Sequence, residues 1–197
     1  MKTQAEFAGA AFGRSIGALV TAFFGFIWFG WGFSALPDFP TFAWIILFAV
    51  AVAFLTLGVL ALRRGKALLR AAGASRQDFW NSRRKPFRAV TLLEGAGCIA
   101  VVILANVFHR VDWIALGISL VVGLHFLPLG KILLFPAYYW TGSLIVACDL
   151  ILATSFKSWN PTASAGISTG TILWVTGLYA LALSAIAARS ARHLSSP

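Results

Sequence analysis

Six apolar stretches constrain what this chain can fold into, because together they fill most of its length. They cover residues 15–36, 41–62, 89–108, 113–127, 133–155 and 166–188. An α-helix needs roughly 20 mostly apolar residues to cross the hydrocarbon core of a bilayer, which is about 30 Å thick. We therefore predict an all-α integral membrane protein, a single domain formed by a bundle of six transmembrane helices.

Two of these stretches leave alternatives open. The fourth, 113–127, is the shortest because Pro128 and Gly130 are expected to break its helix early, so five spans plus a re-entrant segment is the alternative count. The first stretch could be a cleaved signal peptide. Its apolar run is longer than the 7–15 residues typical of such peptides and no convincing cleavage site follows, so we expect it to be retained.

The composition supports a membrane location and excludes other classes. Hydrophobic residues make up 59% of the chain and charged residues 11%, against about 45–50% and about 25% in soluble domains. The chain is too apolar to be disordered, and two cysteines are too few for a disulfide scaffold. An ordinary soluble enzyme is equally unexpected.

The basic residues predict the orientation of the bundle. The formal net charge is +10, and in the six-span topology all Lys and Arg residues except Arg110 and Lys157 fall on one side. Basic residues concentrate on the cytoplasmic side of membrane proteins. We therefore expect both termini in the cytoplasm, and the membrane to be of the bacterial cytoplasmic (inner) type. The same asymmetry favours six spans over five.

Residues 63–88 form the long basic segment on the cytoplasmic side. Gly73 is expected to end a helix there, and Ser75 and Asp78 have the spacing of a helix N-cap. Basic and aromatic side chains together suit the headgroups of anionic lipid. The residues expected to contact headgroups are Arg63, Arg64, Trp80, Arg83, Arg84 and Lys85. Regulation by a specific lipid or partner stays open; nucleic acid is not an expected partner.

Ionisable residues inside a bilayer are costly, so they are the first functional candidates. Glu94 and His125 are expected at one level near the cytoplasmic ends of neighbouring helices, with Lys131 as a third member of the cluster. Asp149 is expected nearer the outer side, at the level of Asn106. Its carboxyl group either serves function or ties helices together through a neighbour such as Asn106.

Asp149 shares a helix face with two earlier residues of the fifth stretch. The eleven-residue spacing from Tyr138 returns to nearly the same direction, with Gly142 between them. Such a stripe could line a water-accessible path or a substrate groove, and Tyr139 lies beside its start. The prolines and glycine of residues 125–140 predict a broken helix, which is typical of transport sites, although an ordinary hairpin explains them equally well.

Small residues at helical spacing predict where helices pack closely. One stripe is Gly9, Gly13, Gly17, Thr21 and Gly25, and a looser one is Gly166, Gly170, Gly177, Ser184 and Ala188. The two helices could pack on one another within the chain, or either could face a second copy in a homo-oligomer.

Several kinds of chemistry are not expected. His109 and His125 belong to opposite sides, so they cannot share a metal, and no metal site or cofactor is predicted. Cys98 and Cys148 are expected to be inert thiols, and whether they are bridged stays open. No nucleotide-binding or hydrolase motif is present.

The leading functional hypothesis is transport or a channel-like activity. In it, a small solute, ion or lipophilic cation moves along a path lined by Asp149, Tyr138, Glu94 and His125. The first alternative is an intramembrane enzyme that uses Glu94 and His125 as an acid/base pair near the cytoplasmic leaflet. The second is a non-catalytic membrane partner or assembly factor. An enzyme is the less favoured of these classes.

Overall fold

The computed structural model of the protein describes residues 4–155 and 160–193. The described residues fold into helices and contain no strand. In chain order the helices are α1 (Gln4–Ser34), α2 (Thr41–Ala71), α3 (Arg76–Asn81), α4 (Arg84–Val107), the short 3-10 helix η1 (Val111–Trp113), α5 (Ile114–Ile132), α6 (Ala137–Ser155) and α7 (Pro161–His193).

Six helices of the described chain are long and apolar enough to cross a membrane. They are Gln4–Ser34, Thr41–Ala71, Arg84–Val107, Val111–Ile132, Ala137–Thr154 and Pro161–Ala187. Large apolar side chains also cover much of the surface; Ile45, Leu93 and Trp140 are 69%, 74% and 74% exposed. Continuous apolar surface on this scale suits lipid rather than water. The predicted bundle of six apolar helices is confirmed, and it indicates an integral membrane protein.

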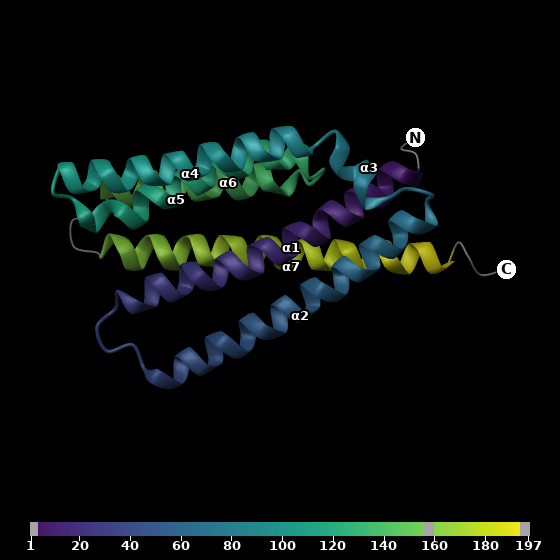
Figure 1. Ribbon diagram of the computed structural model, residues 1–197. Coiled ribbons are helices and arrows are strands. Elements are labelled where there is room, and N and C mark those ends of the chain that lie inside the picture. Colours follow the sequence, from purple (N-terminus) through teal and green to yellow (C-terminus); the bar gives the residue numbers. More distant parts are fainter. Residues whose placement is uncertain (1–3, 156–159, 194–197) are drawn as a thin grey trace.

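The helices form two groups (Figure 1). Helices α4, α5 and α6 make one layer, and α1, α2 and α7 make the other. Helix α1 packs most extensively on α7, and α7 also contacts α5 and α6, so it joins the two groups. The start of α1, the end of α7 and α3 lie together at what we term the basic end. The α1–α2 and α4–α5 connections lie at the far end.

Glycines bring the two layers and their helices close together. A Cβ atom on Gly166 of α7 would collide with the backbone of Gly32 on α1, and one on Gly25 would collide with the Trp174 ring. Nearer the basic end, Gly17 makes room for the Tyr138 hydroxyl group. Of the two alternatives that the glycine stripes left open, the structure shows the first and sixth spans packed on one another within the chain.

Helix α5 runs further than the sequence predicted. It continues through Pro128 and Gly130 to Ile132, so the expected early break is wrong. Proline removes one backbone hydrogen bond, here to Leu124, but Pro128 lies on the exposed side of the helix, where its ring meets no core packing. The chain turns afterwards, where Leu134 takes a positive φ of 56° and Phe135 N–H donates to Gly130 at 3.0 Å.

The basic segment 63–88 is largely helical and is folded against the bundle. Helix α2 continues to Ala71, and Gly73 follows with a φ of 66°, as predicted. Helix α3 begins with the predicted cap: Ser75 and Asp78 form a reciprocal capping box. The Phe79 ring of α3 is buried and packs edge-on against Phe12 of α1, with ring centroids 5.1 Å apart.

Candidate functional site

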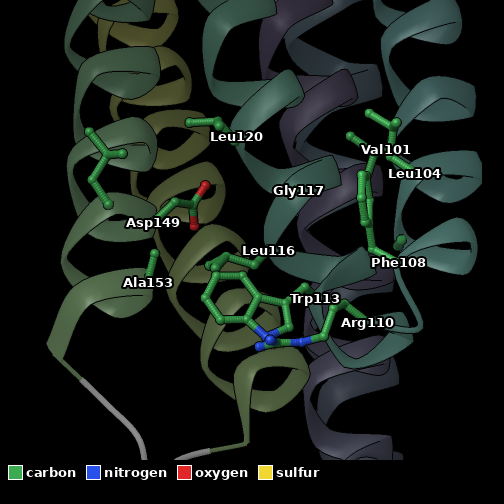
Figure 2. A pocket seen from close by; sticks show the side chains of 12 residues that line it. Val101, Leu104, Phe108, Arg110, Trp113, Leu116, Gly117, Leu120, Asp149 and Ala153 are labelled. Carbon is green, nitrogen blue, oxygen red and sulfur yellow. The ribbon is translucent and has the colours of Figure 1, made fainter.

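A pocket of about 460 Å³ lies toward the far end of the bundle, in the layer formed by α4, α5 and α6 (Figure 2). Its walls are almost wholly apolar. Helix α4 supplies Val101, Leu104, Ala105 and Phe108; η1 and the turn before it supply Arg110 and Trp113; α5 supplies Leu116, Gly117 and Leu120; and α6 supplies Asp149, Leu150 and Ala153. We term it the Asp149 pocket. Its volume is in the range of small-molecule sites.

Asp149 is the acidic group of this pocket. The residue is only 2% exposed, and Figure 2 shows its carboxylate projecting from α6 into the cavity. Within the described part of the chain neither carboxylate oxygen has a hydrogen-bond partner, and no ion pair reaches them. The Ser119 hydroxyl group lies near enough to act on the carboxylate, but its close partner is Thr169 Oγ1 of α7, at 2.5 Å. Asp149 is therefore buried, and the described residues form no ion pair with its carboxyl group.

The mouth of the pocket carries a cation stacked on an aromatic ring. The Arg110 guanidinium lies 5.0 Å from the centroid of the Trp113 ring, and Figure 2 shows the two side chains together below Asp149. Arg110 also forms an exposed ion pair with Asp112 at 3.7 Å. An exposed pair of this kind is screened by solvent. Arg110 is thus shared between the exposed pair with Asp112 and the lining of the pocket that also holds Asp149.

The pocket opens sideways onto the apolar surface of the bundle. Leu104 and Phe108 of α4 are 54% and 69% exposed, and Leu150 of α6 is 55% exposed. Figure 2 shows the α4 and α6 walls on opposite sides of the cavity. On the α5 side, Gly117 lets Val101 approach, because a Cβ there would lie 2.6 Å from Val101 Cγ1. A ligand from a surrounding lipid phase would reach Asp149 between α4 and α6.

Glu94 and His125 meet nearer the basic end, away from this pocket. His125 Nδ1 lies 3.3 Å from Glu94 Oε2, and the two side chains are 11% and 26% exposed. The backbone carbonyl of Val90, one turn before Glu94 on α4, also faces the imidazole. The predicted proximity of Glu94 and His125 is confirmed. Neither side chain lines a pocket described here.

Lys131, the expected third member, is instead part of a second pocket of about 660 Å³ at the basic end. We term this the Lys131 pocket. It lies among the start of α4, the end of α5 and the start of α6, and its lining includes Tyr139. The other lining residues are Ser82, Arg83, Pro86, Val90, Leu127, Pro128 and Ile132.

Two other candidate residues lie where the sequence did not place them. Tyr138 is 1% exposed and packs against Phe126 and Phe135, with both pairs of ring centroids 5.0 Å apart, so it belongs to the core rather than to a groove. Asn106 does not tie Asp149 to α4. It is exposed, and its amide donates to the Val102 carbonyl of its own helix at 2.8 Å.

The stripe that leads from Tyr138 to Asp149 therefore lines no continuous path in this conformation. Between the two, Gly142 is packed against the Gly123 carbonyl and Leu127 of α5. Asp149 is the member of the stripe that lines a described pocket. Side chains and backbone of α5 occupy the place where the sequence predicted a groove.

The residues predicted to meet headgroups divide into two kinds. Arg63, Arg64, Arg84 and Lys85 are exposed. Arg83 is half-buried, and its guanidinium donates to the Phe79 carbonyl at 2.8 Å and stacks 4.6 Å from the Phe79 ring. Trp80 is half-buried against Phe87, with ring centroids 5.3 Å apart. Arg83 and Trp80 are thus fixed parts of the fold.

Sequence reasoning missed the pair at the pocket mouth. In the sequence, Arg110 was noted only because it departs from the charge asymmetry, and Trp113 only as the first residue of the fourth apolar stretch. Their spacing of three residues beside an acidic residue was the available signal.

Cys98 and Cys148 are both free thiols. The residues that the structure describes contain no cluster of three or more His, Cys, Asp or Glu suited to a metal ion.

Comparison with protein-family models, with curated proteins and with solved structures finds no match to this chain. We therefore infer function from the geometry of the two pockets and of the Glu94–His125 pair.

Proposed function

We propose that this protein is a membrane transport protein that binds a small lipophilic cation in the Asp149 pocket. The observation that carries the proposal is the buried, unpartnered carboxylate of Asp149, which projects into an open apolar cavity. A carboxylate in such surroundings is stable only with a proton or a cation on it. An organic cation supplies the missing charge, and its hydrocarbon part suits the walls.

The route into the pocket favours a lipophilic ligand over a hydrated ion. The rim is formed by exposed apolar side chains such as Leu104 and Leu150, so entry is from the lipid side. From the aqueous side, Arg110 stands at the mouth and disfavours an approaching cation. A small metal ion would find one carboxylate and few other oxygen ligands, which is a poor site for hard cations.

The distribution of basic residues supports an orientation with the basic end in the cytoplasm. Most basic residues lie at the basic end, which by the positive-inside rule is the cytoplasmic side. The Asp149 pocket then opens into the outer half of the membrane, with both termini inside. A membrane of the bacterial cytoplasmic type is the location that we propose.

Movement of the ligand requires one wall of the pocket to shift, and α4 is the helix held least firmly. Within α4 only Ala105 is buried, and the helix packs mainly on α5. Few buried contacts mean a low free-energy cost of displacement. We propose that α4 moves against α5 and α6 as the ligand enters and leaves.

The test uses tetraphenylphosphonium, a lipophilic cation that has no proton to donate. Binding is measured by equilibrium dialysis of the full chain in detergent, and uptake is measured in proteoliposomes with an imposed membrane potential. Losing a charged partner costs about 1.5–3 kcal/mol, so Asp149→Asn is expected to weaken binding at least about tenfold and to remove protein-dependent uptake.

The matched control is Asp38→Asn, which removes the same charge from an exposed site in the α1–α2 connection, at the same end of the bundle but outside the pocket. This variant is expected to bind like the native protein. Equal binding by the native protein and Asp149→Asn would refute the proposal.

A second candidate function rests on the 3.3 Å separation of His125 and Glu94. A carboxylate and an imidazole at this distance can act as an acid/base pair, which suits an intramembrane enzyme near the basic end. Glu94→Gln and His125→Asn separate the two functions. If both leave tetraphenylphosphonium uptake intact, the pair is independent of transport; if either abolishes it, the pair belongs to the transport mechanism.

A further inference from the structure

We infer that the Lys131 pocket is a specific binding site for an anionic phospholipid, with the phosphate held between Lys131 and Arg83. This site is separate from the Asp149 pocket and from any transport activity. It also differs from diffuse attraction of the basic end to a charged membrane, because it assigns the affinity to two particular cations. The phosphate is the chemistry that the pocket recognises.

The two cations are in different states, and both suit an anion. Lys131 is exposed, and its side chain makes no hydrogen bond or ion pair with the described residues, so its ammonium group is free to take a ligand. The Arg83 guanidinium is already fixed by the Phe79 carbonyl and ring. Because a guanidinium has five N–H donors, several of them remain available. One cation is therefore pre-organised and the other is adaptable.

The surrounding backbone adds to the positive potential. Helix α4 begins at Arg84, beside the lining residues Ser82 and Pro86, and α6 begins at Ala137, beside Tyr139. The N-terminal ends of helices carry partial positive charge, which favours phosphate. Tyr139 also lines the pocket and carries a phenolic hydroxyl group that can donate a hydrogen bond. The Glu94 carboxylate, one turn after the lining residue Val90 on α4, faces His125 at 3.3 Å.

The remaining lining explains why the ligand is a lipid rather than a free phosphate. Val90, Leu127 and Pro128 form an apolar wall from α4 and α5, and Pro128 is exposed on the surface of the bundle. A cavity of about 660 Å³ exceeds what one phosphate group needs. The phosphate at the basic end and an acyl chain along this wall together fill the site.

The experiment measures the binding of fluorescent phosphatidylglycerol to the full chain in detergent. Competition with unlabelled phosphatidylglycerol, with phosphatidylcholine of the same acyl chains and with glycerol 3-phosphate identifies the ligand. We expect phosphatidylglycerol to compete at least about tenfold better than either. Competition by glycerol 3-phosphate as strong as that by phosphatidylglycerol would overturn the assignment to a lipid, and equal competition by phosphatidylcholine would overturn recognition of the anion.

Matched variants locate the site. Arg83→Gln/Lys131→Gln removes both pocket cations, whereas Arg84→Gln/Lys85→Gln removes the same charge from exposed neighbours that do not line the pocket. The first pair is expected to weaken binding at least about tenfold and the second less than about twofold. Equal losses would mean diffuse attraction and would refute the site. If loss of Arg83 disturbs α3, Lys131→Gln alone still has to weaken binding.

Discussion

Replacing Gly166 by alanine tests the close packing of α7 on α1. An alanine Cβ would lie 2.5 Å from Gly32 N and 2.7 Å from the Trp28 carbonyl oxygen. Ordinary van der Waals separation is about 3.5–4.0 Å, so the two helices must move apart by about 1 Å. Since the obstacles are backbone atoms, no side-chain rotation relieves the collision.

Moving the helices apart lowers the free energy of unfolding, because α1 and α7 lose packing contacts. Overpacking of this kind costs about 1–3 kcal/mol, and alanine returns about 0.5–1 kcal/mol through its better helix propensity. We expect a net loss of about 1–2 kcal/mol in the free energy of unfolding, measured on the purified protein in detergent micelles.

The control is the same substitution at Gly95 on α4, where an added Cβ meets nothing within 4 Å. Gly95→Ala should leave stability unchanged or raise it by up to about 1 kcal/mol. If Gly166→Ala is as stable as Gly95→Ala, the inferred α1–α7 packing is wrong.

Three further predictions concern other parts of the chain. Pro128→Ala should stabilise α5 by about 1 kcal/mol or more, because it restores the backbone hydrogen bond to Leu124; a lower thermal unfolding temperature would contradict this. Hydrogen bonds from Ser75 lower the pKa of the exposed Asp78 carboxyl group. The cap therefore stabilises α3 above the ordinary carboxyl pKa of about 4 and loses its effect as the pH falls through the lowered value. Hydrogen exchange of α3 amides should show protection that fades in acid, and Ser75→Ala should raise the pKa of Asp78; an unchanged value would refute the cap. Glu94→Gln should leave phosphatidylglycerol binding within about twofold of native, because the carboxylate faces His125 rather than the Lys131 pocket; a larger change would place it in that site.

The sequence was sufficient to predict the number of spanning helices, because hydrophobic runs respond directly to the thickness of a bilayer. The lengths predicted for several helices were too short. Helix α1 starts at Gln4 and α2 continues to Ala71, since polar residues at an interface can extend a helix without adding to its apolar run. The break predicted at Pro128 was wrong for a related reason. Whether a proline ends a helix depends on whether the carbonyl group that loses its hydrogen bond is buried.

For the candidate site, the sequence identified the costly groups but not their surroundings. Glu94 and His125 were expected at one level on neighbouring helices, and they lie 3.3 Å apart. Asp149 was predicted to be an intramembrane carboxylate, but the pocket around it depends on how α4 packs against α5. That packing is set by contacts such as Gly117 with Val101, which become visible only once the helices are placed.

We propose that the Asp149 carboxylate takes up a lipophilic cation from the lipid side. Dicyclohexylcarbodiimide, to which protonated carboxyl groups in apolar surroundings add, tests this proposal when the modified residues are mapped by mass spectrometry. Glu94 serves as the internal reference, because it lies outside the Asp149 pocket. We expect Asp149 to be modified, and saturating tetraphenylphosphonium to protect it while leaving the labelling of Glu94 unchanged. Labelling of Asp149 that is absent, or equal with and without the cation, would contradict it.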